Sequence, residues 1–496
     1  MSNFTDLSIK LTKTLNNKTI KEEGIYFTPQ SIIHKNLDII KKQTNLSIKT
    51  ILEPSCGSCE YISLLNNEFK ESSIVGIENN ETIYETIKHL YNTNSNIKLI
   101  KQSYLDVDNP DKYDLIIGNP PYFVIVDKKE QTEKTKDKAI PKDKGNKYYK
   151  SIIDNIKTKN KLYKSYYDGR ANMFILFILH SLNKLNNNGI LSFILPVNFI
   201  NCLYYQKLRK YIYYNYKIID IINCNSDKYL ETQQDTIIFI IQNCNNLSTL
   251  DKDINRQTNN NTIIQNNDKF SICKNNYTIF NTNENIIKLN KLYEGNTKTL
   301  NELNFKVSIG SIVWNQCTNY YNKKKTESTE TLETPDTPET PETLETPEIQ
   351  KKKSILFNAN EYTENDGKIK TRLIYNSDIV NKQLVFKKYN NEHKKNYINK
   401  EGTNEPLLVL NRGYGKGKYK LDYCLINEKE TENYLIENHL MCIKHTTEKD
   451  KKKLIELYNE VMTSFNNPKT NEFIELYFGN NAINTTELQH IVPIFS

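Results

Sequence analysis

Residues from about 20 to 245 alternate short apolar runs with polar or helical stretches, and this alternation constrains the fold more than any other feature. The runs are rich in Ile and Leu, which is typical of strands buried on both faces. Strands that alternate with helices predict an α/β fold whose mainly parallel sheet is covered by helices on both faces. The runs expected to form strands are Lys49–Glu53, Ser73–Glu78, Ile97–Ile100, Tyr113–Gly118, Ile190–Leu195, Ile218–Ile222 and Thr236–Ile241, and a helix is expected at Asn172–Leu185, ended by Asn186–Gly189.

The 496 residues are enough for two or three domains. We expect an α/β domain at 1–245, with a Lys-rich insertion at 127–169, and an Asn-rich linker at 246–299. From 300 to 496 the pattern changes to short strands and turns followed by helices, which predicts a mixed α+β domain. Within it, residues 325–350 repeat Thr-Glu-Thr-Pro and lack core-forming side chains, so we expect them to be disordered.

Composition and charge exclude several classes of protein. No window approaches about 18 consecutive apolar residues, so no membrane-spanning helix is expected, and the N-terminus lacks the apolar segment of a secretory signal. The nine cysteines show no paired metal-ligand spacing, which predicts a reduced, cytoplasmic protein without a metal site. The formal charge of +8 permits a nucleic-acid partner without demonstrating one.

The four residues Asn119-Pro120-Pro121-Tyr122 carry the strongest chemical signal. They directly follow an expected strand, and ligands bind at the carboxyl ends of the strands in open α/β sheets. The two prolines fix the backbone φ and remove two N–H donors. Such a turn presents the amide oxygen of Asn119 and the carbonyl of Pro120 as acceptors for one –NH₂ group, while Tyr122 offers a flat face to a planar ring.

A pair of acceptors can make an aromatic amino group more nucleophilic. The amino group of adenine is a weak nucleophile because its lone pair is delocalised into the ring. Two acceptors that hold both hydrogens favour a pyramidal nitrogen whose lone pair points at an electrophile, by positioning and electrostatics without a general base. An Asn-Pro-Pro turn can also simply end a strand, because Asn and Pro are turn residues. The motif alone therefore leaves both interpretations open.

Two further features indicate a nucleotide-like ligand at the same edge of the sheet. The segment Glu53–Tyr61 follows the first strand and is rich in small residues, and its Gly57 lets a ligand approach the backbone. Glu78 ends the second strand, 25 residues past Glu53, where an acidic residue grips ribose hydroxyls in Rossmann-type sites. Glu78 could also be an ordinary neighbour of a helix N-cap, but its placement at the end of the second strand favours the ligand role.

These motifs together resemble the N6-adenine DNA methyltransferases of type II restriction-modification systems. The resemblance is to the class with the cofactor loop first, the N-P-P-Y motif next and a C-terminal target-recognition domain, and it spans nearly the whole chain. The matching segments are Gly24–Pro29 (the segment over the cofactor), Glu53–Tyr61 (the cofactor loop), Ile77–Glu78 (the ribose acid), Ser103–Leu105, Asn119–Tyr122, Gly169–Phe174, Phe193–Phe199 and Tyr229.

The resemblance implies a Rossmann-like S-adenosylmethionine-dependent methyltransferase sheet in the first domain and a target-recognition domain from residue 300. It implies methyl transfer from S-adenosyl-L-methionine to the N6 amino group of an adenine flipped out of specific double-stranded DNA, and it allows a separate cognate restriction endonuclease as a partner. The implied catalytic residues are Asn119, Pro120, Pro121, Tyr122 and Tyr229, and the implied cofactor-binding residues are Thr28, Glu53, Pro54, Ser55, Cys56, Gly57, Glu78, Ser103, Tyr104 and Asn119.

Three features depart from the pattern of this family. Cys59 stands where the cofactor loop usually has its second Gly, and Ser103 stands where Asp or Asn is usual, with Asp106 nearby as a substitute. The insertion at 127–169 is unusually long. The first two departures bear on cofactor affinity more than on the reaction, because the four positions Asn119–Tyr122 are intact.

The second half of the chain offers one nucleic-acid-binding candidate. The segment Asn411–Lys420 interleaves Gly, cations and aromatic residues. Its glycines allow close backbone approach, Lys416 and Lys418 could meet phosphates, and Arg412 could read guanine. A Gly-rich basic loop can also be a solvated hairpin. Lys306–Gln316 resembles the opening of the family's recognition domain.

Three alternatives stay open from the sequence. Methylation of a glutamine amide in a release factor uses the same N-P-P-Y logic, but those enzymes usually carry a helical domain before the cofactor loop and end soon after the sheet. Here about 50 residues precede the loop and some 250 follow the sheet. Methylation of adenine in RNA also requires an extruded base. The third alternative is a non-catalytic nucleic-acid-binding relative, against which the intact Asn119–Tyr122 motif speaks.

Overall fold

The computed structural model divides into two compact units, Met1–Ile287 and Lys288–Ser496, each of which has its own core. The predicted insertion at 127–169 and the repeat at 325–350 lie outside the described residues. The residues that the structure describes are 3–43, 47–108, 110–124, 172–224, 229–230, 234–244, 267–274, 276–295, 297–313, 357–358, 371–389, 394–398, 400–412, 421–427, 433–478 and 483–495.

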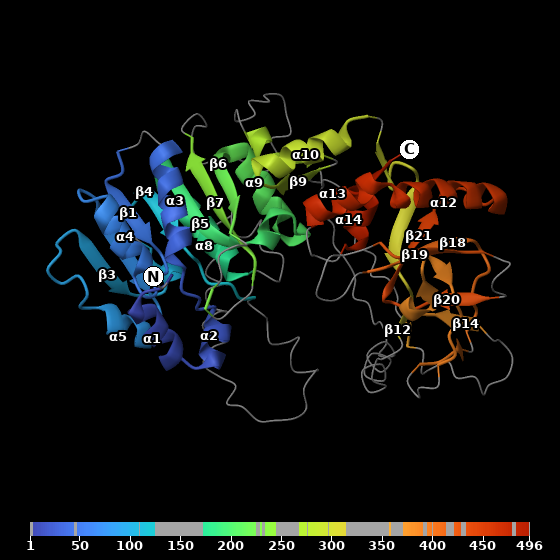
Figure 1. Cartoon of the computed structure of the whole chain (residues 1–496), viewed down its shortest axis with the longest axis horizontal. Helices are drawn as coiled ribbons and strands as arrows, with labels where there is room; N and C mark the ends of the chain where they lie inside the picture. Colours follow the sequence, from blue (N-terminus) through green and yellow to red (C-terminus); the bar gives the residue numbers. More distant parts are fainter. Residues whose placement is uncertain are drawn as a thin grey trace, which may run out of the picture. The chain divides into compact units, whose positions relative to one another are not determined.

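A seven-stranded sheet forms the centre of the first unit (Figure 1). In order across the sheet, the strands are β3 (Ile97–Lys101), β2 (Ser73–Glu78), β1 (Thr50–Glu53), β4 (Tyr113–Gly118), β5 (Leu185–Pro196), β7 (Thr236–Asn243) and β6 (Tyr216–Asn223). The five strands from β3 to β5 are parallel, whereas β7 pairs antiparallel with both β5 and β6. Each of the seven strands predicted from the sequence is present, within a few residues of its expected bounds.

Helices cover both faces of this sheet (Figure 1). One layer consists of α1 (Asp6–Thr14), α2 (Asn17–Glu23), α3 (Gln30–Gln43), α4 (Glu60–Glu68) and α5 (Glu81–Ile87), and the other contains α8 (Met173–Leu182) and α9 (Gln206–Asn215). The α/β fold with a mainly parallel sheet is therefore confirmed.

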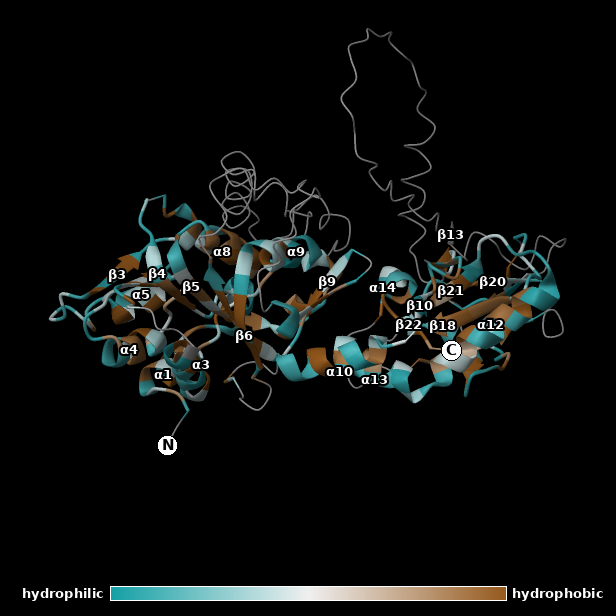
Figure 2. Cartoon of the chain, turned by 90° about the horizontal axis from the view of Figure 1, so that it is seen from above, coloured by the Kyte–Doolittle hydropathy of each residue, from teal (hydrophilic) through white to brown (hydrophobic). Residues whose placement is uncertain are grey.

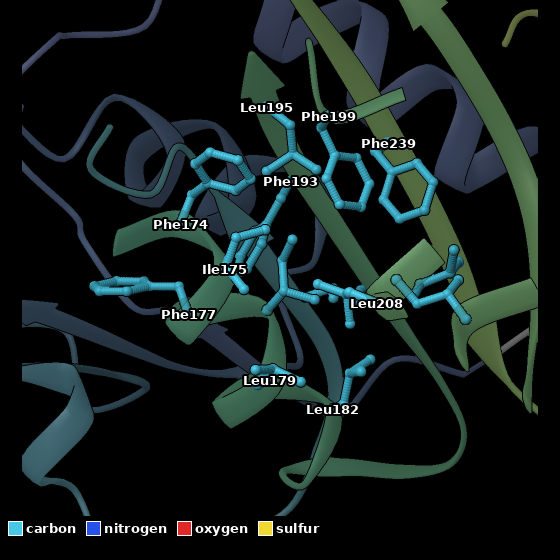
Figure 3. Close-up of a cluster of buried hydrophobic side chains, with 14 of the residues drawn as sticks. Phe174, Ile175, Phe177, Leu179, Leu182, Phe193, Leu195, Phe199, Leu208 and Phe239 are labelled. Atoms are coloured by element: carbon cyan, nitrogen blue, oxygen red, sulfur yellow. The ribbon is translucent and has the colours of Figure 1, made fainter. Parts of the chain in front are cut away.

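Alternating side chains of the strands pack into the two cores, one on each face of the sheet, because successive residues of a strand point to opposite faces. Leu52 and Ile116 join the core under α8 and α9, while their neighbours Ile51 and Ile117 join the core under α3 and α4. Figure 3 shows Phe193 of β5 among the apolar side chains of α8. The central strands are largely hydrophobic in Figure 2, as expected for a sheet that is covered on both faces.

Two predictions about element ends are wrong. The helix α8 stops at Leu182, and Asn186–Gly189, expected to end it, lie within β5. The register of β5 on β4 shifts in this stretch. A Cβ at Gly189 would lie 2.9 Å from the carbonyl oxygen of Tyr113, so the glycine permits a close strand-to-strand approach and does not serve as a helix cap.

The segment 246–299, predicted to be a linker, carries regular structure in its described part. It forms a hairpin of β8 (Ser271–Lys274) and β9 (Tyr277–Phe280) and then α10 (Asn283–Tyr293). The ring of Phe280 is fully buried and stacks on Phe239 with a centroid distance of 5.7 Å. The Asn-rich composition obscured two short strands that the core of the first unit requires.

The second unit is a mixed α+β structure, as predicted for the C-terminal part. It contains a four-stranded antiparallel sheet in the order β11-β21-β18-β19, a three-stranded sheet in the order β17-β14-β20, and helices that follow these strands. Its elements are β10 (Lys298–Thr299), β11 (Phe305–Ile309), β12 (Ile312–Val313), β13 (Phe357–Asn358), β14 (Thr371–Ile374), β15 (Ile379–Val380), β16 (Gln383–Leu384), β17 (Tyr397–Ile398), β18 (Leu407–Asn411), β19 (Tyr423–Ile426), β20 (Tyr434–Ile436), β21 (Leu440–His445), α12 (Lys451–Asn466), α13 (Pro468–Phe478), α14 (Thr485–His490) and β22 (Pro493–Ile494).

Candidate active site

The loop between β1 and α4 lies at the carboxyl edge of the sheet. The backbone N–H of Cys56 donates to the carbonyl of Ile77 in β2 at 2.9 Å, and the N–H of Cys59 donates to the carbonyl of Cys56 at 2.7 Å. Gly57 and Cys59 both adopt left-handed backbone conformations, with φ of 51° and 64°. A non-Gly residue in that conformation costs about 1–2 kcal/mol, which explains why Gly is usual at the position of Cys59.

The Cys59 side chain does not obstruct ligand binding. It is 2% exposed and packs into the core under α4, away from the residues that line the pocket at this edge. The departure from the usual Gly therefore changes the backbone cost of the loop and leaves the pocket open.

That pocket lies where β1, β2 and β4 end, as expected for an open α/β sheet. It is walled on one side by the segment from Glu23 to Phe27 and on another by apolar side chains that include Met173 and Phe177. Eight of the residues predicted to bind or react line it, namely Pro54, Ser55, Gly57, Glu78, Ser103, Tyr104, Asn119 and Pro121.

Glu78 is held by the loops on either side of it. One carboxylate oxygen accepts from the backbone N–H of Gly57 at 2.9 Å, and the other accepts from the N–H of Asn80 at 2.6 Å. Burial raises the pKa of this carboxyl group above its usual value, although these backbone N–H groups oppose the shift. The arrangement places an acceptor carboxylate in the pocket, and the role of Glu78 in binding ribose hydroxyls remains a prediction.

Asn119 follows β4 and also lines the pocket. Its amide nitrogen donates to the carbonyl of Tyr26 at 3.1 Å, and its amide oxygen accepts from the hydroxyl of Tyr122 at 2.5 Å. The backbone carbonyl of Asn119 accepts from the hydroxyl of Ser55 at 3.0 Å. The side chain is thus fixed by the N-terminal segment and by its own turn.

The Tyr122 hydroxyl has two acceptors within reach and only one proton. Besides the amide oxygen of Asn119, it can donate to the carbonyl of Ile194 at 2.7 Å. The amide oxygen of Asn119 has two lone pairs, so it can accept from a ligand while it also accepts from Tyr122. The ring of Tyr122 meets Phe174 edge to face, with centroids 6.1 Å apart.

The close approach of the N-terminal segment to this turn depends on Gly24. Its φ is 64°, and a Cβ there would lie 2.8 Å from the backbone nitrogen of Tyr122. The sequence predicted a segment over the cofactor at Gly24–Pro29 with Thr28 as the contact. Of this segment, residues up to Phe27 line the pocket, whereas Thr28 is buried and does not line it, so its role remains a prediction.

Five other predicted site residues do not line this pocket, namely Glu53, Cys56, Pro120, Tyr122 and Tyr229. Glu53, Cys56 and Tyr229 are buried, and the hydroxyl of Tyr229 lies 3.3 Å from that of Thr236. Tyr229 lines a separate small cavity beside Tyr26. Pro120 is buried beneath the turn. Their assigned roles remain predictions.

Glu53 carries a buried oxygen with no hydrogen-bond partner and is 3% exposed. Burial raises the pKa of its carboxyl group well above the usual value, and Glu78 and Glu60 add to the rise. When folding raises a carboxyl pKa, the free energy of unfolding is highest at low pH. It falls as the pH rises through the pKa of the folded state. The ionised form therefore destabilises the protein that has no ligand bound.

We therefore expect Glu53→Gln to raise the melting temperature of the ligand-free protein at pH 8, by about 2–4 °C for each kcal/mol of relieved cost. The gain should shrink as the pH falls, because protonation of the wild-type carboxyl removes the cost of its buried charge. Thermal unfolding of both proteins across this pH range measures the difference. An unchanged or lower melting temperature at pH 8 would show that the ionised carboxylate has a stabilising partner.

The apolar side of the pocket was largely missed by the sequence analysis. Ile83, Leu105, Phe123 and Phe177 contribute to it together with Met173. They come from four separate elements, and their apolar character has an ordinary explanation in core packing. Leu105 lies in the matched segment Ser103–Leu105 and Met173 in the matched segment Gly169–Phe174, whereas no signal in the sequence indicated Ile83, Phe123 or Phe177.

The predicted DNA contacts are only partly within the described residues. Arg412 is half-buried, and its guanidinium donates to the carbonyl of Asn438 at 3.4 Å. Lys416 and Lys418 lie outside the described part of the chain. Among the described residues, no cluster of side chains could hold a metal ion, and no helix is long and apolar enough to cross a membrane.

The strand order, the antiparallel β7 between β5 and β6, and the pocket at the ends of β1, β2 and β4 define a Rossmann-like, class I S-adenosylmethionine-dependent methyltransferase fold. Residues 6–230 match the family described as Eco57I restriction-modification methylase. The match confirms the resemblance to restriction-modification methyltransferases, and with it S-adenosyl-L-methionine as the cofactor of this fold.

Curated relatives support the same class. The chain is 29% identical over 200 residues to the type II methyltransferase M.AccI of Acinetobacter calcoaceticus, covering 40% of this chain and 33% of that protein. It is 27% identical over 244 residues to the type II methyltransferase M.CvrRI of Paramecium bursaria Chlorella virus XZ-6E, covering 49% and 54%. The chain thus spans about a third to a half of the length of these relatives.

One solved structure is similar at low sequence identity. The methyltransferase subunit of a type I restriction-modification system from Streptococcus thermophilus is 17% identical, with a TM-score of 0.33, over 56% of this chain and 55% of that one.

The pocket residues fit the cofactor. Glu78 offers carboxylate oxygens to hydroxyl groups, Gly57 leaves its backbone open to a ligand, and the apolar wall around Met173 suits a planar ring. These features lie in one pocket that also contains the Asn119 side chain.

Proposed function

We propose that the chain methylates the N6 amino group of adenine in double-stranded DNA at a specific sequence, with S-adenosyl-L-methionine as the methyl donor and the second unit as the target-recognition domain. The base is proposed to leave the duplex before it reacts. The proposal also includes two untested predictions, which are a separate cognate restriction endonuclease and an intracellular location.

One observation carries the proposal. The amide of Asn119 lines the predicted cofactor pocket and is oriented by two hydrogen bonds, to Tyr26 and from Tyr122. A fixed amide oxygen beside a cofactor pocket is what positioning of an –NH₂ group requires. The restriction-modification relatives of residues 6–230 favour DNA as the carrier of that group.

The proposed reaction needs no general base at the start. Asn119 and the carbonyl of Pro120 accept the two amino hydrogens, so that the nitrogen lone pair points toward the pocket. Tyr122 and Tyr229 are proposed to stack on the base. The cofactor supplies an electrophilic methyl group on a sulfonium. The bound cofactor would give this methyl group to the nitrogen and leave as a neutral thioether, and the nitrogen would then release one proton to water.

Removal of one hydroxyl tests how the Asn119 amide is oriented. Tyr122→Phe deletes one of its two hydrogen bonds, and a neutral hydrogen bond contributes about 1 kcal/mol. We expect kcat to fall about fivefold while cofactor affinity stays the same. Steady-state kinetics measure both quantities. The exposed Tyr204 provides the control, since Tyr204→Phe should retain full activity, and a Tyr122→Phe enzyme equal to it would remove the orienting role.

The substrate class is tested by incubating the full chain with S-adenosylmethionine labelled in the methyl group and four acceptors in parallel: duplex DNA, single-stranded DNA, RNA and a release factor. We expect label in duplex DNA. Label confined to RNA or to the release factor would replace the proposal by one of the alternatives, and no transfer to any acceptor would support a non-catalytic relative.

A further inference from the structure

The second unit presents an exposed surface that combines apolar, aromatic and basic side chains. Val385, Phe386 and Tyr397 are 44%, 43% and 42% exposed, and Lys387 and Lys388 between them are also exposed. These five residues form the basic-aromatic surface. Among the described residues of the second unit, its three apolar members are the large hydrophobic side chains left exposed. Their exposure has no explanation in core packing.

The guanidinium of Arg372, in β14, lies beneath this surface. It is 5.2 Å from the ring centroid of Phe386 and 5.7 Å from that of Tyr397, so the two exposed rings flank one buried cation. The same guanidinium donates to the carbonyl of Lys387 at 2.7 Å and to the side chain of Asn396 at 3.1 Å. Arg372 thus fixes both edges of the surface.

A buried carboxylate fixes the segment from below. Asp378 accepts from the backbone N–H of Lys387 at 3.0 Å and from the hydroxyl of Tyr389 at 2.8 Å, and it lies 3.6 Å from the guanidinium of Arg372. Asp378 has no exposed surface. Its charge is balanced by Arg372, so the lysine side chains above are the charges that face solvent.

Preorganised rings beside exposed lysines suit an anionic, partly aromatic partner. Residues 382–400 contain six lysines and one glutamate, so the segment of the chain that carries most of the surface is strongly basic. Lysines meet phosphates, while rings pack against sugars or unstacked bases. An apolar protein partner alone would not need the flanking lysines.

We propose that the basic-aromatic surface is a nucleic-acid contact of the second unit, with Lys387 and Lys388 on backbone phosphates and Phe386 and Tyr397 against sugar or base. This inference rests on the proposed function. It extends that function to residues that the sequence did not indicate and that are separate from the Arg412 segment. Arg372 acts as the positioning residue that presents them.

The test compares DNA affinity of full-length variants by fluorescence anisotropy over a salt series, with a labelled duplex that the wild-type enzyme methylates. We expect Lys387→Ala/Lys388→Ala to weaken binding about tenfold and to reduce the slope of log affinity against log salt by about 1.8, or 0.9 for each lost phosphate contact. Phe386→Ala should weaken binding about fivefold or more, as expected for the loss of an aromatic contact.

Three controls keep the result interpretable. Lys452→Ala/Lys453→Ala removes the same charge from two exposed residues of α12 and should leave affinity and slope unchanged. Lys387→Arg/Lys388→Arg should restore both, and the thermal unfolding of all variants should match that of the wild type, which shows that the fold of the second unit persists. Surface variants that bind DNA as tightly as the α12 control would overturn the inference and leave the surface to an acidic protein partner. A wild-type enzyme that neither binds nor methylates duplex DNA would instead contradict the proposed function.

Discussion

Asn119→Ala is expected to reduce kcat about 10²- to 10³-fold, the effect typical of removing one preorganised hydrogen-bonding group from a transition state. The wild-type amide is fixed between Tyr26 and Tyr122, so its oxygen needs no reorganisation when the amino group arrives. Cofactor affinity should change less than about threefold, because the backbone carbonyl that accepts from Ser55 remains. Single-turnover methylation and calorimetric cofactor binding measure the two quantities separately.

The matched control is Asn92→Ala, which removes the same side chain from an exposed position of the same unit. This variant should behave as wild type in both assays. Undiminished turnover of Asn119→Ala, with the control also active, would show that the amide does not hold the reacting group. A loss of cofactor affinity as large as the loss of kcat would assign Asn119 to the cofactor and not to the acceptor.

Glu78→Ala is expected to weaken cofactor binding about 10- to 100-fold, since hydrogen bonds to charged groups contribute about 1.5–3 kcal/mol. The substitution removes the predicted acceptor of the ribose hydroxyls. It also leaves the backbone N–H groups of Gly57 and Asn80 without their present partner, so the loop loses its anchor. Titration calorimetry with S-adenosylmethionine measures the effect.

The pH dependence of binding gives the same residue a second test. Because burial raises the pKa of Glu78, the carboxylate is lost by protonation at a higher pH than for an ordinary glutamate. Cofactor affinity should therefore fall as the pH falls through that raised value, and the fall should be absent in Glu78→Ala. Glu81→Ala is the control, because Glu81 is an exposed carboxylate that pairs with Lys101 at 2.9 Å. Glu81→Ala with the same loss of affinity would point to general electrostatics.

Much of the first unit could be predicted from sequence because its signals are local. The residues Ser73–Glu78 predict a strand without reference to the rest of the chain. Asn119–Tyr122 directly follows another strand of this kind. Parallel strands bring their carboxyl ends to one edge, so Glu78 and Asn119 could be assigned to one site without knowledge of the packing.

Features that depend on the space between elements could not be predicted. Nothing in the sequence shows that the Tyr122 hydroxyl reaches the amide of Asn119, or that Phe27 and not Thr28 walls the pocket. The sequence shows that Cys59 replaces the usual Gly, but the reason why Gly is usual, a left-handed backbone at this position, requires the φ of the structure. The hairpin β8–β9 was missed because its strands are only four residues long, while their burial depends on long-range contacts.

The basic-aromatic surface illustrates the same limit in the second unit. Lys387 and Lys388 are two lysines among many in a chain with 67 basic residues. Their significance comes from Arg372 and Asp378, which bond to the backbone of Lys387. A sequence search for interleaved Gly and cations selected Asn411–Lys420 because that pattern is contiguous, whereas the surface is assembled from separated residues.

The most direct test of the central claim is the chemical identity of the methylated nucleoside. Duplex DNA that has been incubated with the enzyme and labelled S-adenosylmethionine is digested to nucleosides and separated by chromatography with mass detection. We expect the label to appear in N6-methyl-2′-deoxyadenosine, at adenines within one short sequence. Label on cytosine, or label spread over adenines without regard to sequence, would contradict it.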